Sequence, residues 1–281
     1  MDRRTFIGSV TAAGLVSQLI WAATEHRIEK IGLELYTVRD ALSQDFEGTL
    51  AKVAKIGYEE VEFAGYFAHV PDFNPLPKRA REILDAEGLS APATHVPYSA
   101  LSPENWPKVI EASKVLGHDY IVNPSVDREV LKQPDGWKRA AESFNRAGEE
   151  SQKAGIQFGY HNHVEEFKPT ADGKLPYDIL LTESDPKLVK MEMDLGWAHE
   201  ARVDPLAYFA RYPGRFPLVH VKDFDKNDMM TEVGSGVIDW KSIFAKSDVA
   251  GIKHYLVEHD NPMFPFMSIE KSYQYLKQLT F

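Results

Sequence analysis

The sequence predicts a single α/β domain of the (β/α)8 barrel class, in which eight parallel strands alternate with helices and close into a ring. Short β-rich runs recur along the chain, and their starts lie roughly 28–37 residues apart, about one strand-plus-helix unit each. Amphipathic stretches with apolar residues at helical spacing fill the intervals. No Gly-x-Gly-x-x-Gly turn follows the first run, which disfavours an open dinucleotide-binding sheet.

Each predicted element follows from a local pattern. The expected strands, in chain order, are Ile31–Tyr36, Glu60–Ala64, Ala91–Val96, Asp119–Asn123, Ile156–His161, Val189–Asp194, Pro217–Lys222 and His254–His259. Helical periodicity is clearest in Phe46–Ile56, Pro77–Glu87 and Trp137–Ala154. A glycine between a predicted helix and an apolar strand is typical of αβ connections, and such a glycine occurs at Gly57, Gly88, Gly117 and Gly155.

Composition excludes several classes of protein. The 281 residues include 32 Lys and Arg against 42 Asp and Glu, which gives a formal charge of −10. A hydrophobic fraction of 43% and a charged fraction of 26% are typical of a globular protein and exclude a disordered or fibrous one. An acidic chain lacks the basic surface of a nucleic-acid binder. Because the chain has no cysteine, any metal must be held by His, Asp, Glu or carbonyl oxygens.

Residues 1–23 are predicted to be an export signal, and residues 24–281 are predicted to form the barrel. The pair Arg3-Arg4 precedes a weakly apolar, uncharged stretch, which is typical of a twin-arginine signal. This predicts a periplasmic protein with no stable membrane association after cleavage. The alternative is an uncleaved membrane anchor, since about 18 uncharged residues are at the lower limit of a spanning length. Polar residues such as Ser17 weaken that alternative.

Titratable side chains end most of the predicted strands. In a (β/α)8 barrel, catalysis belongs to the C-terminal ends of the strands. The residues at these ends are Glu34, Glu62, His95, His161 with His163, Asp194, His220 with Lys222, and Glu258 with His259. A structural role is the simpler explanation for any one of them. Their recurrence is not explained by packing, because buried parallel strands are mostly Val, Ile and Leu.

Four of these residues predict a metal site. One residue from each of four consecutive strands gives the set His161, Asp194, His220 and Glu258. Two imidazoles and two carboxylates suit Mn(II), Zn(II), Fe(II) or Co(II), whereas Mg(II) and Ca(II) prefer oxygen ligands. The alternative is a hydrogen-bonded polar cluster without a metal.

Longer motifs around these residues resemble the sugar phosphate isomerase/epimerase family, the xylose isomerase-like TIM barrels. They are Tyr160-His161-Asn162-His163, Asp194-Leu195-Gly196-Trp197-Ala198-His199 and His220-Val221-Lys222-Asp223. The resemblance covers essentially the whole chain after the signal. It implies a TIM barrel whose divalent metal is held by Glu, Asp, His and Glu on strands five to eight. These positions correspond to His161, Asp194, His220 and Glu258, so strand five departs from the family pattern. An imidazole bound to metal cannot readily act as a base, because its lone pair is used.

The activity that the resemblance implies is that of a sugar isomerase or epimerase. The enzyme would abstract a proton next to a carbonyl and stabilise the enediolate with the metal. The catalytic candidates are Glu258, Lys222, His163 and Glu62, and the substrate-binding candidates are His95, Trp197, Glu34 and His199. Lys222 is expected either to have a lowered pKa and shuttle protons or to bind a substrate oxygen. Trp197 is interpreted as a stacking wall for a pyranose, with ordinary rim packing as the alternative.

Two other functions stay open. The first is a lyase or dehydratase that expels a β-leaving group from a 3-keto sugar or glycoside through the same enediolate. His161 favours this reaction, and a periplasmic location favours unphosphorylated substrates. The second is a carbohydrate-binding barrel without catalysis. The expected partner is a small-molecule sugar or glycoside, and a homo-oligomer is left open. The endonuclease relative is disfavoured, since it needs more metal ligands and a basic face.

Overall fold

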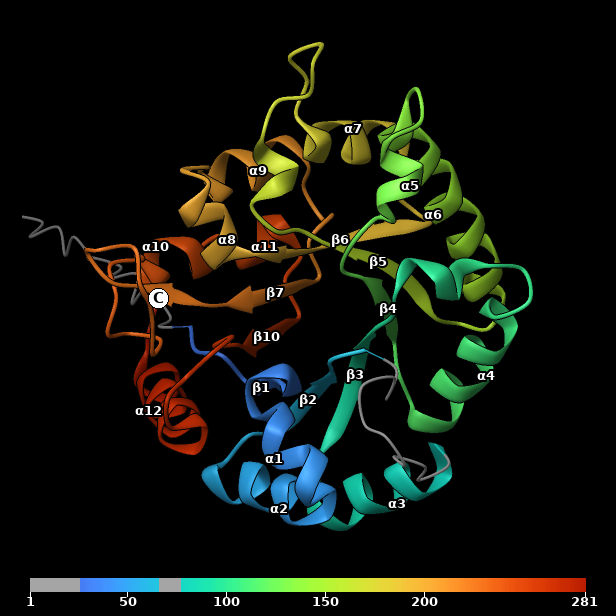
Figure 1. Cartoon of the computed structure of the whole chain (residues 1–281). Coiled ribbons are helices and arrows are strands. Elements are labelled where there is room, and N and C mark those ends of the chain that lie inside the picture. Colours follow the sequence, from blue (N-terminus) through green and yellow to red (C-terminus); the bar gives the residue numbers. More distant parts are fainter. Residues whose placement is uncertain (1–25, 66–76) are drawn as a thin grey trace, which may run out of the picture.

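Eight parallel strands close into one barrel, as the sequence predicted (Figure 1). The computed structural model describes residues 26–65 and 77–281, so the predicted signal lies outside the described residues. Neighbouring strands around the ring follow the order β1-β10-β7-β6-β5-β4-β3-β2. Their bounds are β1 Ile31–Glu34, β2 Glu60–Phe63, β3 Ser90–His95, β4 Tyr120–Asn123, β5 Gln157–His161, β6 Val189–Asp194, β7 Leu218–Val221 and β10 His254–Val257.

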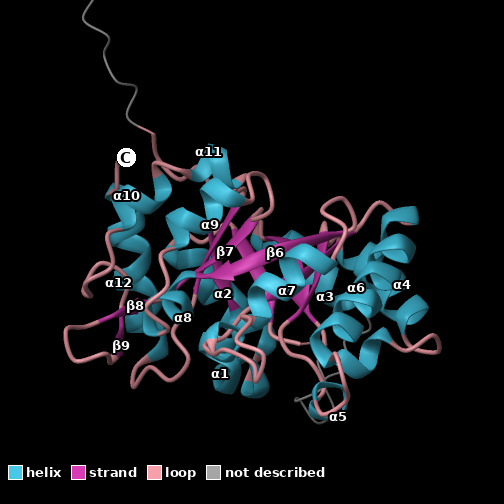
Figure 2. Cartoon of the chain, turned by 90° about the horizontal axis from the view of Figure 1, so that it is seen from above, coloured by secondary structure: helices cyan, strands magenta, loops and turns pink. Residues whose placement is uncertain are grey.

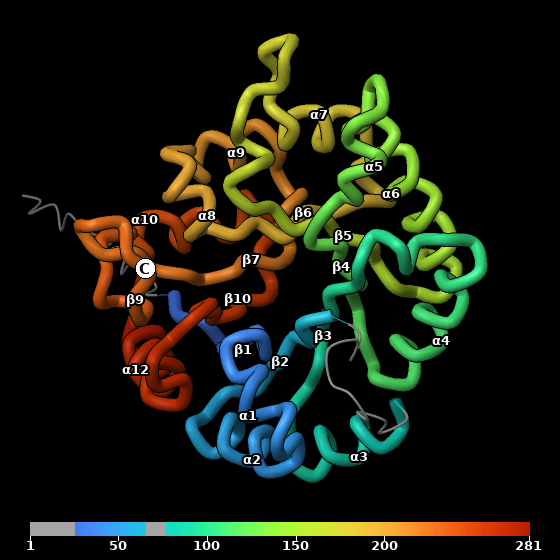
Figure 3. Tube along the Cα trace, in the orientation of Figure 1, coloured from blue at the N-terminus to red at the C-terminus, as the bar shows by residue number. Residues whose placement is uncertain are grey.

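Helices surround the barrel on the outside, and the trace in Figure 3 follows the chain once around the ring. Their bounds are α1 Arg39–Gln44, α2 Phe46–Ile56, α3 Pro77–Glu87, α4 Trp106–Leu116, α5 Arg128–Leu131, α6 Gly136–Lys153, α7 Pro176–Glu183, α8 Leu195–Glu200, α9 Pro205–Arg211, α10 Trp240–Phe244, α11 Ser247–Ala250 and α12 Pro265–Gln278. Short 3-10 helices cover Leu35–Val38, Tyr98–Leu101 and Glu165–Phe167. The helices bury their apolar faces on the strands. On α6, the Phe144 ring packs against those of Phe158 and Tyr160 at 5.3 and 5.1 Å.

The predicted helix–glycine–strand turns are present. Gly117 and Gly155 follow α4 and α6, and both have a φ of 79°. A residue with a Cβ is strained in this left-handed region, so glycine is the residue that lets each helix turn sharply back into a strand. The local sequence therefore determines where these helices end.

The strand ends differ from prediction for local reasons. β1 stops at Glu34 rather than Tyr36, because the Glu34 carboxylate accepts a hydrogen bond from the Tyr36 amide at 3.1 Å and the chain turns into a 3-10 helix. β10 stops at Val257, so Glu258 follows the strand directly. Both carboxylates thus lie at the rim, where the barrel opens.

A loop after β7 is held by one buried carboxylate. The hairpin of β8 Asp223–Phe224 and β9 Met230–Thr231 lies at this position, as Figure 2 shows. Asp223 accepts hydrogen bonds from the amides of Gly234 and Gly236 at 2.8 and 3.2 Å and from Trp240 Nε1 at 3.0 Å. Asp223, the last residue of the motif His220-Val221-Lys222-Asp223, therefore has a structural role.

Polar and apolar layers divide the barrel interior. Ala93, Tyr120, Val122, Leu218 and Leu256 form a buried apolar cluster within the ring. The titratable residues gather above it, toward the C-terminal ends of the strands. Across residues 26–65 and 77–281, no helix combines the length and apolar character needed to cross a membrane.

Candidate metal centre

The predicted ligands converge at the C-terminal ends of the strands. The ligand atoms of Asp194, His220 and Glu258 all lie within 4.8 Å of one another, and all three side chains are buried. His220 Nδ1 lies 2.6 Å from Glu258 Oε2 and 3.9 Å from Asp194 Oδ2. Three of the four predicted ligands therefore form a group that fits one ion.

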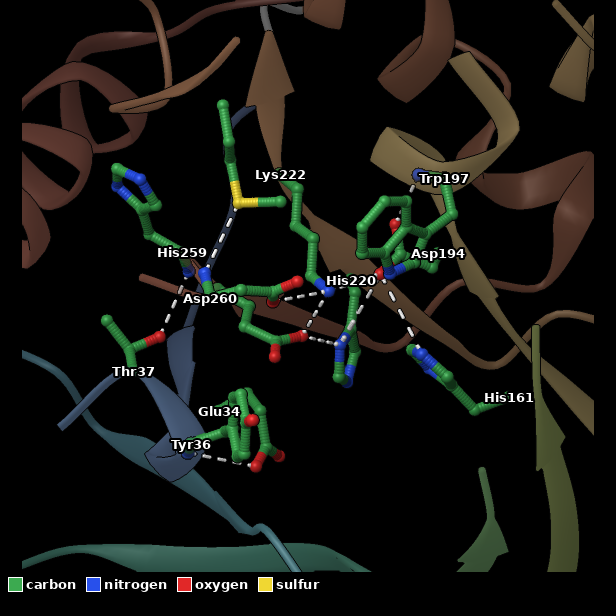
Figure 4. A network of polar contacts seen from close by, with 12 residues as sticks. Glu34, Tyr36, Thr37, His161, Asp194, Trp197, His220, Lys222, His259 and Asp260 are labelled. Carbon is green, nitrogen blue, oxygen red and sulfur yellow. Dashed lines mark hydrogen bonds and ion pairs between the residues drawn. The ribbon is translucent and has the colours of Figure 1, made fainter. Parts of the chain in front are cut away.

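His161 lies at the edge of this group. Its Nε2 is 3.8 Å from Asp194 Oδ2, and its ring centroid is 4.5 Å from that of His220. Figure 4 shows His161 aimed at Asp194 from the side of the site opposite Lys222. The same ring also belongs to a second group of metal-ligating atoms, formed with His95, Glu192 and His220.

Glu62 and Glu192 form an inner layer behind the two histidines. Glu62 Oε2 lies 2.7 Å from His220 Nε2, and Glu192 Oε2 lies 3.1 Å from His161 Nδ1. Neither carboxylate lines the cavity, and that of Glu62 contacts His220, so the catalytic role of Glu62 stays a prediction. Sequence reasoning missed Glu192, although strand alternation places it on the same face as Asp194, two residues later.

Lys222 is held among three carboxylates. Its Nζ lies 3.0 Å from Asp194 Oδ2, 2.9 Å from Glu258 Oε2 and 2.9 Å from Asp260 Oδ1 (Figure 4). Burial alone lowers the pKa of Lys222, but these carboxylates outweigh it and raise the pKa well above its usual value. The expected lowering of the pKa is therefore wrong. At neutral pH the group is an ammonium, able to donate hydrogen bonds and unable to act as a base.

The cluster has the charge expected of a cation site. Burial raises the pKa of Glu34 well above its usual value, and the Glu62 carboxylate adds to the effect. Burial and the Glu192 carboxylate raise the pKa of Glu62 to about 8, and burial also raises the pKa of Asp194. Burial is the main cause of these three shifts, whereas the nearby His220 and Lys222 outweigh burial at Glu192 and Glu258 and hold their pKa values well below the usual value. A divalent ion fits both this charge and the mixed imidazole and carboxylate donors.

A cavity of about 530 Å³ opens over this cluster, a volume in the range of small-ligand sites. The predicted residues on its wall are Glu34, His95, His161, His163, Lys222 and Glu258. The aromatic ring of Tyr36 and the prolines Pro97 and Pro124 also contribute. Most of the candidate catalytic and binding residues therefore face one space.

The candidate base His163 lies on the cavity wall beside the ligands. Its ring packs edge-on against His161, with the centroids 4.9 Å apart. Burial, and then the charge of Lys222, lowers the pKa of His163 to about 4. Its backbone amide donates to Glu166 Oε2 at 2.7 Å, which fixes the loop that carries it.

The remaining substrate-binding candidates fall into two groups. Glu34 and His95 line the cavity, and His95 also bonds Glu192 through Nε2 at 2.6 Å. Trp197 lies with its ring 4.9 Å from Lys222 Nζ, a cation–π contact. His199 stacks on Phe224 at 6.0 Å and is not on the cavity wall, so the geometry does not support its binding role.

His259, the other titratable residue that follows the last strand, is also outside the cluster. Its amide bonds Thr37 Oγ1 at 3.0 Å, and its Nδ1 lies 2.9 Å from Ser268 Oγ. Asp260, one residue further, does belong to the site through Lys222. Alternation along the extended chain explains the difference, since Glu258 and Asp260 point to the same side.

Comparison with known proteins agrees with this geometry. Residues 50–278 match the family described as xylose isomerase-like TIM barrel. An inosose dehydratase from Lacticaseibacillus casei is 30% identical over 142 residues, which cover 44% of this chain and 46% of the relative, less than half of its length. An inosose dehydratase from Clostridium perfringens is 25% identical over 273 residues, which cover 84% of this chain and 90% of the relative.

A solved structure extends the likeness to the whole barrel. A sugar phosphate isomerase/epimerase from Parabacteroides distasonis is 32% identical, with a TM-score of 0.75 over 92% of this chain and 98% of that chain. The chain therefore belongs to the xylose isomerase-like TIM barrel family, and its described part carries a buried cluster of metal-ligating residues.

Proposed function

We propose that the chain is a divalent-metal-dependent enzyme that removes the proton next to the carbonyl of an unphosphorylated keto sugar. The observation that carries the proposal is the convergence of Asp194, His220 and Glu258, with His161 beside them, under a cavity of about 530 Å³. When bound there, a divalent ion would stabilise the negative charge that develops on the sugar oxygens.

The chain's own residues supply the remaining chemistry. His163, on the cavity wall, is placed to take the α-proton, and the electrons of the C–H bond then form the C=C bond of the enediolate. The ammonium of Lys222 faces the same cavity, where its positive charge favours the developing oxyanion. Trp197 holds this ammonium from one side, which limits the positions that it can take.

The charges around the cavity favour an uncharged substrate. In the described part of the chain, Lys222 is the one Lys or Arg on the wall, and three carboxylates already contact it. Glu34 and Asp260 add acidic groups to the same wall. A phosphate ester would meet the Asp260 carboxylate there and find no cationic side chain without carboxylate partners. The sequence of residues 66–76 adds neither Lys nor Arg.

One observation favours elimination as a second candidate. Epimerisation by two bases needs a group on each face of the sugar, but both nitrogens of His161 are directed at carboxylates, Glu192 and Asp194. Elimination needs one base. As the enediolate re-forms the carbonyl, its C=C electrons form the new bond between the α and β carbons, and the β C–O bond breaks with its electrons going to the leaving oxygen. That oxygen takes the proton that His163 removed. Inosose dehydratases among the relatives support this lyase candidate.

The test is metal-dependent exchange of the α-proton of a keto sugar in deuterated water, followed by NMR. We expect exchange with Mn(II) or Co(II), none after chelation, and none in Glu258→Gln. The matched control Glu270→Gln, on the exposed side of α12, should exchange normally. An unsaturated product indicates the lyase, and an isomer indicates the isomerase or epimerase.

The same experiment distinguishes the alternatives. Intact binding of sugars without exchange in metal-loaded protein would refute enolisation and leave a carbohydrate-binding barrel. Exchange of a 6-phosphorylated sugar at the rate of its free counterpart would refute the preference for uncharged substrates.

A further inference from the structure

The inner carboxylates Glu62 and Glu192 contact the ligand histidines from below. Both side chains are fully buried, and neither touches the cavity. They come from β2 and β6, strands separated by more than 120 residues of sequence, yet both reach the same imidazole of His220. Substrate cannot reach these groups, so any contribution to the reaction must act through the histidines.

The two nitrogens of His161 face different layers of carboxylates: the inner layer of Glu62 and Glu192, and an outer layer formed by Asp194 and Glu258. Nδ1 points to the inner layer, 3.1 Å from Glu192 Oε2. Nε2 points to the outer layer, 3.8 Å from Asp194 Oδ2. If Nδ1 carries the proton and donates it to Glu192, the lone pair on Nε2 is free on the side of Asp194.

His220 is arranged the opposite way. Its Nε2 points inward, 2.7 Å from Glu62 Oε2 and 3.3 Å from Glu192 Oε2. Its Nδ1 points outward, 2.6 Å from Glu258 Oε2 and 3.9 Å from Asp194 Oδ2. Nε2 is placed to donate its proton to the inner carboxylates, so an ion on the outer side would bind Nδ1 in place of the hydrogen bond that Nδ1 now makes with Glu258.

An imidazole ligand binds a metal through its unprotonated nitrogen, and a hydrogen bond from the other nitrogen decides which one that is. We propose that Glu62 and Glu192 are positioning residues that fix the two ligands in opposite tautomers, so that His161 offers Nε2 and His220 offers Nδ1 to one divalent ion. This inference rests on the metal site of the proposed function.

Glu192 is the centre of this arrangement. Its Oε2 also lies 2.6 Å from His95 Nε2, so three imidazoles share one carboxylate oxygen. Side chains two residues apart on a strand lie on one face, so β6 supplies both the outer ligand Asp194 and the inner carboxylate Glu192. Movement of this strand would shift both layers together.

A direct test uses the unmodified protein. Loaded with diamagnetic Zn(II), its histidine side chains are observed by long-range ¹H–¹⁵N NMR, which separates the two tautomers. We expect two metal-bound imidazoles, one protonated at Nδ1 and one at Nε2. Two metal-bound imidazoles with the same tautomer would overturn the inference.

A variant test measures metal affinity rather than turnover. Glu192→Gln keeps the volume but removes the charge, and we expect Co(II) to bind 10- to 100-fold more weakly with an altered visible spectrum. The conservative Glu192→Asp should recover part of the affinity. The matched control is Glu60→Gln, because Glu60 is also buried and also pairs with an imidazole, His254 Nδ1 at 2.8 Å, away from the ligands.

The outcomes separate this inference from the proposed function. Wild-type protein that binds neither Zn(II) nor Co(II) refutes the metal site itself, and the inference with it. If the wild-type protein binds Co(II), and the affinity falls by the same small factor in Glu192→Gln and in Glu60→Gln, only the positioning role is refuted. Melting curves of the metal-free variants show whether each one is folded. If Glu192→Gln does not fold, the tautomers of the wild-type protein decide.

Discussion

Replacing Lys222 with methionine should have opposite effects on the metal-free and the metal-loaded protein. The Lys222 side chain is 2% exposed, and its Nζ lies within 3.0 Å of three carboxylate oxygens. Removing one partner of a buried ion pair leaves uncompensated charge, which typically costs about 3–5 kcal/mol. For a domain of this size, the melting temperature of metal-free Lys222→Met should fall by roughly 10 °C.

A divalent ion should reverse most of that loss. The oxygens that Lys222 holds, Asp194 Oδ2 and Glu258 Oε2, belong to predicted metal ligands, so the ammonium and the ion compete for them. Without the ammonium, the ion should bind more tightly. Binding at 100 times the dissociation constant stabilises a protein by about 2.7 kcal/mol. We therefore expect Mn(II) to stabilise Lys222→Met more than it stabilises the wild-type protein.

Urea unfolding in EDTA and in Mn(II) measures both effects. The matched control is Lys190→Met, because Lys190 Nζ donates to a neutral carbonyl, Gly214 O, at 2.9 Å. Its loss should cost about 1 kcal/mol with no dependence on metal. The reasoning fails if Lys222→Met costs no more than Lys190→Met, or if Mn(II) stabilises the wild-type protein more than the variant.

Three further predictions concern other parts of the chain. Asp223→Asn should lower the free energy of unfolding by about 3 kcal/mol and speed proteolysis of the loop that it holds, whereas Asp248→Asn, at an exposed position, should not. Burial lowers the pKa of His118 to about 4, so its neutral form stabilises the fold above pH 6.5. The free energy of unfolding should fall by about 3 kcal/mol as the pH falls toward 4. Acid unfolding curves should show a smaller fall in His118→Gln. Replacing Arg3 and Arg4 with lysines should stop export, measured as protein in the periplasmic fraction, and unchanged export would contradict the twin-arginine prediction.

Sequence periodicity was sufficient for the barrel. Helix α2 has the predicted bounds Phe46–Ile56, and each of the eight strands overlaps its predicted run. These features depend on neighbours a few positions apart, so local patterns carry them. The exact ends of β1 and β10 were missed, because a side-chain cap at Glu34 and the rim geometry decide them.

Residue type and strand position also identified most of the candidate site. Asp194, His220 and Glu258 meet as predicted because the C-terminal ends of consecutive parallel strands lie side by side. Alternation along β6 contained a signal for Glu192 that was not used. Glu62 and His199 do not line the cavity, because sequence places a residue at a strand end or in a helix without giving its depth, and their functional roles stay predictions.

The order of strands and helices, the kinds of ligand and the acidic character of the chain were determined by the sequence itself, through patterns that repeat over a few residues. The tertiary structure decided which carboxylates lie above and below the histidines, and that Lys222 is a cation rather than a base. These properties depend on contacts across the barrel, such as that between Glu62 and His220, 158 positions apart. Desolvation and charge at such contacts act over a few ångströms of space, and only the closed ring brings these groups within that distance of one another.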